Sequence, residues 1–117
     1  MSDWVDVCAQ VDLEPGRARL IDINGLKIGV YNLDGEYFAL EDFCTHDQFP
    51  LLGCGLPVDL LIHGEEIMCP RHGARFSIRT GNALCAPAYE PTPTFPVRVI
   101  DGIVQIQVSR DDCRAKK

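Results

Sequence analysis

Polar and apolar residues alternate at the start of this chain, over residues 4–8, which is the pattern of a half-buried β-strand. Farther along, runs rich in β-branched and aromatic residues flank the turn dipeptides Asn24-Gly25, Asp34-Gly35 and Asp101-Gly102. The pattern predicts strands at residues 4–8, 18–23, 27–32, 37–40, 96–100 and 103–108. No segment keeps an apolar period of 3.6 through three turns, so we predict an all-β fold with little or no helix, and at most a short helical turn at residues 58–61.

The character of the sequence changes between residues 41 and 95. This stretch contains all three histidines and four of the six cysteines. It is too long for a simple connection in a compact domain, and long loops of this kind are usually functional. We therefore predict one domain at residues 1–108, in which residues 41–95 form a binding insertion on an antiparallel β frame. Residues 109–117 are polar, and we expect this tail to fray.

Composition and charge limit the partners of the chain. Its 117 residues, 46% of them hydrophobic, suffice for one domain with a genuine core. The net charge of -6 argues against binding to nucleic acid or to an anionic membrane, because both attract clustered cations. The chain shows no signal-peptide pattern, and its most apolar stretch, residues 49–62, is interrupted by proline and glycine. We expect a soluble, cytoplasmic protein.

Two pairs of metal-binding side chains lie in the inserted region. Cys44 and His46 form a C-x-H pair, and Cys69 and His72 form a C-x2-H pair. Thiolate is a ligand for zinc and for the iron of iron–sulfur clusters, and imidazole binds both metals. Zinc ribbons and fingers usually show C-x2–4-C followed by a second such pair or by H-x3–5-H, and neither spacing is present. The pairs therefore predict a metal centre that is not of the common zinc type.

The remaining cysteines and the third histidine have more ordinary interpretations. A single cysteine is usually a buried core residue, and we expect this of Cys8, Cys85 and Cys113. Cys54 stands in a glycine-rich loop, where a free thiol is expected, although it is a candidate ligand in principle. His63 precedes a glycine and has no cysteine at a matching offset, so we expect a solvated loop residue.

The two ligand pairs resemble the signature of Rieske iron–sulfur proteins. The likeness continues at Gly73, Phe76, Thr80-Gly81 and Ala86-Pro87-Ala88. It covers the whole chain in outline and implies a Rieske-like antiparallel β sandwich or barrel with an inserted cluster-binding subdomain. The family holds one 2Fe–2S cluster with two cysteines on one iron and two histidines on the other. Carried over to this chain, the family's arrangement implies that Cys44 and Cys69 bind the inner iron and that His46 and His72 bind the outer iron.

The resemblance also implies a low reduction potential. High-potential respiratory members have a disulfide between the two ligand loops, at positions where this chain has Phe49 and Arg71. They also carry serine and tyrosine hydroxyls that donate hydrogen bonds to sulfur, where this chain has Ala74 and Phe76. Such donors stabilise the reduced cluster, so their absence lowers the potential. The segment between the ligand pairs is longer than in compact ferredoxins of the family, and we place the surplus at residues 54–62.

The small soluble members of this family are electron carriers rather than enzymes. The resemblance implies that this chain receives single electrons from a flavin-dependent ferredoxin reductase and passes them to a terminal oxygenase. Docking is expected near His46 and His72, with residues 49–52 and 87–89 as an apolar rim. Two alternatives stay open: the small Rieske-like subunit of a nitrite reductase, and a zinc-binding structural or interaction module.

Overall fold

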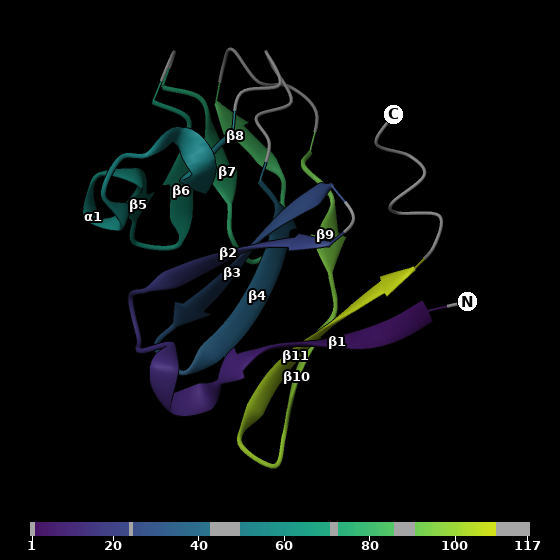
Figure 1. Ribbon diagram of the computed structural model, residues 1–117. Helices are drawn as coiled ribbons and strands as arrows, with labels where there is room; N and C mark the ends of the chain where they lie inside the picture. Colours follow the sequence, from purple (N-terminus) through teal and green to yellow (C-terminus); the bar gives the residue numbers. More distant parts are fainter. Residues whose placement is uncertain (1, 24, 43–49, 71–72, 86–90, 110–117) are drawn as a thin grey trace.

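The computed structural model describes residues 2–23, 25–42, 50–70, 73–85 and 91–109 of the chain. Its strands form three antiparallel sheets, which are stacked from bottom to top in Figure 1. The lower two sheets make up the frame, and the third sheet belongs to the segment that carries the predicted metal ligands. All six predicted strands are present, so the all-β prediction is confirmed.

The frame consists of a three-stranded sheet and a four-stranded sheet. The first has the order β1 (Ser2–Ala9), β11 (Ile103–Ser109) and β10 (Val97–Ile100). The second has the order β2 (Ala18–Ile23), β3 (Leu26–Leu33), β4 (Glu36–Glu41) and β9 (Thr94–Phe95). A 3-10 turn, η1 (Gln10–Asp12), follows β1. Hairpins join consecutive strands at the predicted turns, where Asp34 and Asp101 adopt φ values of 56° and 52°.

The third sheet has the order β5 (Ile62–His63), β6 (Glu66–Met68), β7 (Arg75–Ser77) and β8 (Ala83–Cys85). A 3-10 turn, η2 (Leu52–Cys54), and one short helix, α1 (Val58–Leu61), precede it. The predicted helical turn at residues 58–61 is therefore confirmed. Within the described ranges α1 is the longest helix, and no helix there could cross a membrane.

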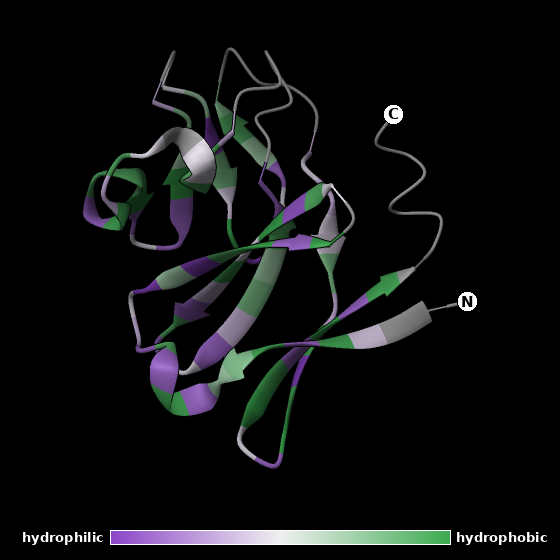
Figure 2. Ribbon diagram, in the orientation of Figure 1, coloured by the Kyte–Doolittle hydropathy of each residue, from purple (hydrophilic) through white to green (hydrophobic). Residues whose placement is uncertain are grey.

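The second sheet is the middle layer of the molecule, because β3 contributes to two cores. Ile28 and Val30 point toward the first sheet and pack with Val104 and Ile106. The alternate residues Tyr31 and Leu33 point the other way, into a core shared with the third sheet. Figure 2 shows the corresponding apolar positions along β10, β11 and the strands of the third sheet. β3 is thus buried on both faces, while β2 and β10 keep one exposed face.

The upper core joins the third sheet to the frame. It contains Leu51, Ile67 and Phe76 from the inserted segment, each fully buried, packed with Tyr31 and Leu40 of the frame. Because full burial of a large apolar side chain contributes about 1.5–3 kcal/mol, this contact is the main link between the two parts. The third sheet therefore keeps a set position on β3 and β4.

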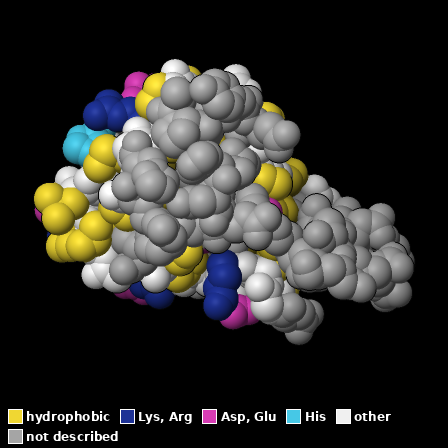
Figure 3. Space-filling view, turned by 90° about the horizontal axis from the view of Figure 1, so that it is seen from above, with side chains coloured by type: hydrophobic (Ala, Val, Ile, Leu, Met, Phe, Trp, Pro, Cys, Tyr) yellow, Lys and Arg dark blue, Asp and Glu magenta, His cyan; other side chains and the backbone are white. Residues whose placement is uncertain are grey.

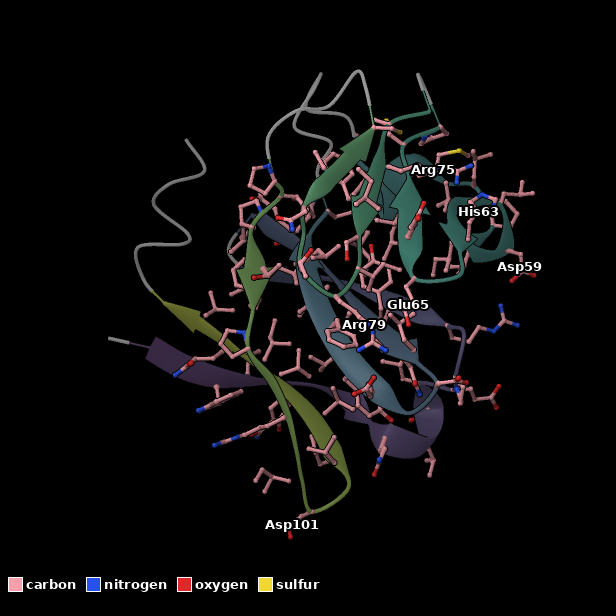
Figure 4. All side chains as sticks on the ribbon, turned by 180° about the vertical axis from the view of Figure 1, so that it is seen from behind. Asp59, His63, Glu65, Arg75, Arg79 and Asp101 are labelled. Carbon is pink, nitrogen blue, oxygen red and sulfur yellow. The ribbon has the colours of Figure 1, made fainter. Side chains whose placement is uncertain are left out.

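An exposed arginine adds a polar link between the same two parts. The Nη2 atom of Arg79 lies 2.7 Å from Glu36 Oε1 in β4, and its Nε atom lies 2.9 Å from Glu65 Oε1. The guanidinium also stacks over Phe38, 5.0 Å from the ring centre. Figure 4 shows Arg79 beside Glu65. The hydrogen bond from Arg79 lowers the pKa of Glu65, so this carboxylate stays charged and paired at neutral pH.

Gly81 allows the segment after β8 to approach the turn that follows β7. Its N–H donates to the Ser77 carbonyl (2.7 Å), and its own carbonyl accepts from Thr92 N–H (2.8 Å). A Cβ atom at Gly81 would lie 2.3 Å from the Thr92 carbonyl oxygen, and its φ is +78°. Only glycine fits this position without a shift of backbone.

We predict that Gly81→Ala destabilises the protein more than Gly64→Ala does. Both glycines have positive φ, but a Cβ atom at Gly64 would meet nothing within 4 Å. Gly64→Ala should cost about 1 kcal/mol, the penalty of a left-handed alanine, and lower the thermal midpoint by about 4 °C. Gly81→Ala should lower the thermal midpoint at least twice as far, as measured by thermal unfolding followed by circular dichroism. Equal shifts would show that the backbone at Thr92 yields easily.

Candidate metal centre

Of the four predicted ligands, Cys69 lies in the described part of the chain. Cys44 and His46 fall within residues 43–49, and His72 within residues 71–72, which lie outside the described residues. No cluster of three or more potential metal-binding side chains is present among the described residues, as expected when three of four predicted ligands fall outside them. The centre can therefore be described through Cys69 and through the anchors on either side of each ligand-bearing segment.

Cys69 lies at the base of a tight loop between β6 and β7. Its N–H donates to the Ala74 carbonyl (2.7 Å), and its carbonyl accepts from Gly73 N–H (3.0 Å). The hairpin pairing of Met68 with Arg75 holds the two arms of this loop together. Cys69 itself is fully buried and belongs to the upper core. The loop that contains the predicted ligand His72 therefore begins and ends at hydrogen-bonded positions.

Asp42 anchors the segment that carries Cys44 and His46. The N–H of Asp42 donates to the Lys27 carbonyl (2.9 Å), which holds the end of β4 on β3. Its carboxylate accepts from Leu52 N–H through Oδ1 and from Gly53 N–H through Oδ2, the latter at 2.8 Å. Burial raises the pKa of Asp42, and the backbone donors oppose that shift. Asp42 is not among the residues predicted from the sequence, because an acid after a strand does not reveal which distant N–H groups it will reach.

The segment before β9 is anchored by Thr92. Its Oγ1 donates to the Glu41 carbonyl (3.3 Å) at the end of β4, and its N–H donates to the Gly81 carbonyl. The N–H of Glu41 in turn donates to the Pro93 carbonyl (2.9 Å). Residues 86–90, which contain Ala86-Pro87-Ala88 and the apolar rim predicted at residues 87–89, lie outside the described residues. The chain re-enters the described structure beside the same end of β4 from which the first ligand segment departs.

The anchors of all three segments gather at one end of the molecule. Met68 pairs with Arg75 and Arg75 with Cys85, so the loop of Cys69 and the end of β8 are adjacent. Leu51, directly after the first segment, shares the upper core with Cys69. In Figure 1 these ends of β4, β6, β7 and β8 lie toward the top of the molecule. The fold therefore brings the described residues next to these segments to the same end of the molecule.

Several other predictions for this region need correction. Cys85 was expected in the core, but it is exposed, because β8 is the edge strand of the third sheet; its thiol donates to the Gly73 carbonyl (3.6 Å). His63 was expected in a loop but ends strand β5, where its exposed ring donates to the Leu60 carbonyl (3.1 Å). Cys8 is half-buried against the lower core, close to the expectation, and burial raises its pKa. Cys113 lies outside the described residues.

The apolar rim predicted at residues 49–52 is also partly wrong. Leu51 is fully buried and lines no exposed rim, and Leu52 is half-buried against the upper core. The exposed leucines of this region are Leu56 and Leu60, with 43% and 55% of their surface accessible. Figure 3 shows hydrophobic side chains gathered on the side where α1 lies, within the segment predicted to hold the surplus residues.

A buried tyrosine hydroxyl lies close to the first anchor. Tyr31 is fully buried, and its hydroxyl has no hydrogen-bond partner among the described residues. Burial, and secondarily the charge of Asp42, raises the pKa of Tyr31 well above its usual value, so the phenol stays neutral. A Cβ atom at Gly29 would lie 2.9 Å from this hydroxyl and 2.8 Å from Leu52 Cδ1. Glycine at position 29 thus provides the space in which η2 packs on β3.

The described part of the centre, around Cys69, fits an iron–sulfur cluster. Cys69 combines full burial with a position at the base of a short hydrogen-bonded loop, and its neighbours Ala74 and Phe76 are apolar and fully buried. A thiolate in such surroundings gains from a bound metal, because an isolated buried anion is costly. The donor set predicted for the whole centre, two thiolates and two imidazoles, is that of a histidine-ligated 2Fe–2S site.

Comparison with known proteins finds a matching family model and curated relatives. The family model described as "Rieske [2Fe-2S] domain" matches residues 3–96 of the chain. The ferredoxin component of the naphthalene 1,2-dioxygenase system of Pseudomonas aeruginosa is 33% identical over 106 residues, which cover 91% of this chain and 96% of the relative. The 3-phenylpropionate/cinnamic acid dioxygenase ferredoxin subunit of Photorhabdus laumondii is 37% identical over 105 residues, covering 90% and 94%.

Solved structures show the same fold. The complex of reduced oxygenase and oxidized ferredoxin in carbazole 1,9a-dioxygenase contains a chain that matches with a TM-score of 0.78 and 34% identity, covering 88% of this chain and 91% of that one. The ferredoxin of Sphingomonas yanoikuyae B1 also matches with a TM-score of 0.78, at 31% identity, covering 92% of this chain and 100% of the other. The match therefore extends over nearly the whole length of these relatives.

Proposed function

The chain belongs to the Rieske [2Fe-2S] domain family, and on this basis we propose that it carries single electrons from a flavin-dependent ferredoxin reductase to a terminal oxygenase. Its cofactor is one Rieske 2Fe–2S cluster. The observation that carries the proposal is the end-to-end similarity to ferredoxin components of dioxygenase systems, 33% over 96% of one relative's length. A solved complex of such a ferredoxin with its oxygenase supports the direction of transfer. We place the protein in the cytoplasm, without nucleic acid or membrane as a partner.

We propose that Cys44 and Cys69 bind the inner iron of this cluster and that His46 and His72 bind the outer iron. The full burial of Cys69 supports its place on the inner, shielded side. The shared packing of Leu51 and Cys69 supports the meeting of the two ligand pairs. When bound, the cluster supplies a site that gains and loses one electron at a potential of roughly -150 to +300 mV. The protein shields its inner side and leaves the histidine side to partners.

Docking of reductase and oxygenase is proposed at the end of the molecule that carries His46 and His72. The gathering of the segment anchors at this end supports the proposal. The net charge of -6 favours partners that present a basic surface, since complementary charge speeds encounter. The contact should be small and transient, as is usual between electron-transfer partners.

The low potential within the family's range is a further part of the proposal. Ala74 and Phe76 are both fully buried in the core that contains Cys69, and neither side chain can donate a hydrogen bond. Hydrogen bonds to the sulfurs stabilise the extra negative charge of the reduced state, so their absence favours the oxidised state. The chain should therefore work near the lower end of roughly -150 to +300 mV.

Reconstituted electron transfer tests the proposed function. The purified protein should contain about two irons and two sulfides per chain. With the reductase and oxygenase of a 3-phenylpropionate dioxygenase system, NADH should reduce the cluster only when the reductase is present. Mixing with oxidised oxygenase should then restore the oxidised absorption spectrum. A cluster that is reduced but does not pass its electron to the oxygenase would contradict the carrier role. Stoichiometric zinc without sulfide would contradict the proposed cofactor.

Serine substitution tests the thiolate ligands. Cys69→Ser and Cys44→Ser should each abolish cluster assembly, because thiolates supply most of the binding and compensate the iron charge. Cys85→Ser is the matched control for Cys69→Ser, since the two cysteines lie at the same end of the third sheet but Cys85 is exposed. It should retain full iron and sulfide content. A colourless Cys54→Ser variant beside a coloured Cys44→Ser variant would reverse the assignment.

Two hydroxyl substitutions test the origin of the low potential. Ala74→Ser and Phe76→Tyr should each raise the potential by about 40 mV, which corresponds to about 1 kcal/mol of extra stabilisation of the reduced state. The reduction potential of the double variant should rise further than that of either single variant, as measured by redox titration at constant cluster content. Both sites are fully buried, so each added hydroxyl needs a partner to be tolerated. Hydroxyls ordered against sulfur without a rise in potential would contradict the hydrogen-bond explanation.

A further inference from the structure

We propose that Asp42 is a positioning residue that sets the placement of the first ligand-bearing segment by holding both of its ends. The inference rests on the ligand assignment proposed above, in which Cys44 and His46 belong to residues 43–50. It concerns the groups on either side of that segment, all of them in the described structure. In this proposal Asp42 acts through the backbone groups that it binds.

The geometry of Asp42 joins three elements at one point. Its own N–H is bound by the Lys27 carbonyl of β3 at 2.9 Å, so the place where the segment begins is set by the middle sheet. Its two carboxylate oxygens accept from two different N–H groups, those of Leu52 and Gly53 in η2. One side chain thus connects the start of the segment to the residues that directly follow its end.

The burial of this carboxylate indicates that the connection is strong. Only 5% of Asp42 is exposed, and burying a charged group is costly unless hydrogen bonds compensate for the lost water. No lysine or arginine among the described residues forms an ion pair with it; Lys27, the nearest along β3, pairs with Asp22 at 3.2 Å. The compensation comes mainly from backbone donors, with a smaller contribution from the charge of Lys27. Charge-assisted hydrogen bonds of this kind are about twice as strong as neutral ones.

Tight packing gives the connection little freedom. A Cβ atom at Gly53 would lie 3.1 Å from Asp42 Oδ2 and 3.2 Å from Pro50 Cβ, and Leu52 fills the space left by Gly29 on β3. Leu51, one residue earlier, is fully buried in the same core as Cys69. The end of the first segment that Asp42 holds is therefore packed into the surroundings of the second ligand pair. Loss of the carboxylate should disturb the relation between the two pairs, and not merely one loop.

Graded variants of Asp42 separate positioning from charge. Asp42→Asn removes the charge but keeps one oxygen that can accept an N–H, whereas Asp42→Ala removes the charge and both acceptors. Asp59→Asn and Asp59→Ala are matched controls, because Asp59 is an exposed acid in α1 of the same inserted segment. An effect of charge alone would be equal in Asp42→Asn and Asp42→Ala. An effect of positioning should be larger in the alanine variant.

The experiment uses the cluster-loaded protein and three measurements. Bleaching of the visible absorption in excess chelator gives the rate of cluster loss; electron paramagnetic resonance gives the g-values of the reduced cluster; hydrogen-exchange mass spectrometry follows a peptide spanning residues 50–56. We expect Asp42→Ala to lose its cluster about tenfold faster than wild type, with Asp42→Asn between them. The g-values of the surviving cluster should shift in the same order. Hydrogen exchange in residues 50–56 should be faster in both Asp42 variants than in wild type. The Asp59 variants should match wild type in every measurement.

Three outcomes would overturn the proposal. Equal effects in Asp42→Asn and Asp42→Ala would indicate charge alone. Faster cluster loss with unchanged g-values would indicate a general loss of stability. Unchanged exchange in residues 50–56 would show that the carboxylate does not hold this end. If Asp42→Ala does not fold, Asp42→Asn is compared with Asp59→Asn, and identical g-values and exchange would overturn the proposal. A wrong ligand assignment gives a different result. In that case a Cys44→Ser variant would keep its cluster, while the hydrogen exchange of the Asp42 variants would be unaffected.

Discussion

Successive residues of β3 point into two different cores, and this double burial organises the molecule. Ile28 and Val30 close the lower core with β11, while Tyr31 and Leu33 support the third sheet from below. Because a close-packed interior tolerates little displacement, the third sheet cannot shift on β3 and β4 without loss of contacts on its whole lower face. The position of Cys69 is set through this contact, since it belongs to the same buried cluster as Tyr31.

The segments that carry the predicted ligands are short, and hydrogen bonds to the frame or to neighbouring strands hold their ends. The Cys69 loop is closed by Ala74 and Gly73, and the segment before β9 is tied to β4 through Thr92. The first segment is closed by a side chain, Asp42, in place of a β ladder. This arrangement follows a general requirement of metal sites, in which groups behind the ligands set their orientation. An electron carrier benefits further, because ligands already in place need less rearrangement between redox states.

The surroundings of Cys69 are apolar, and they bear directly on the proposed role. Ala74, Phe76 and Leu51 are fully buried in the core that contains Cys69, and none of these three side chains carries a hydroxyl. A transient carrier needs a potential below that of its acceptor, and under the proposed ligand assignment the lack of hydroxyl groups at positions 74 and 76 favours that setting. Acidic residues dominate the chain as a whole, with 17 against 11 basic ones, which suits encounter with basic partner surfaces.

Local patterns in the sequence were enough to predict much of this protein. Turn dipeptides and β-branched runs located six of the seven strands of the frame, with β9 missed; a short helical turn was expected at 58–61, and the two ligand pairs indicated the family. These features depend on neighbours within a few residues, where backbone preference and metal-ligand spacing act directly. The ligand roles of all four residues stay predictions, and three of the four lie outside the described residues.

Other features depended on contacts between distant residues, and only the tertiary structure decided them. Cys85 looked like a core thiol, but its strand became the edge of a sheet and left it exposed. Leu51 looked like a surface rim, but the third sheet covers it. Asp42 looked like any acid at a strand end, until folding placed the N–H groups of Leu52 and Gly53 within its reach. Burial and hydrogen-bond partners come from the way the layers stack, and no local pattern specifies which face of a strand another layer will cover.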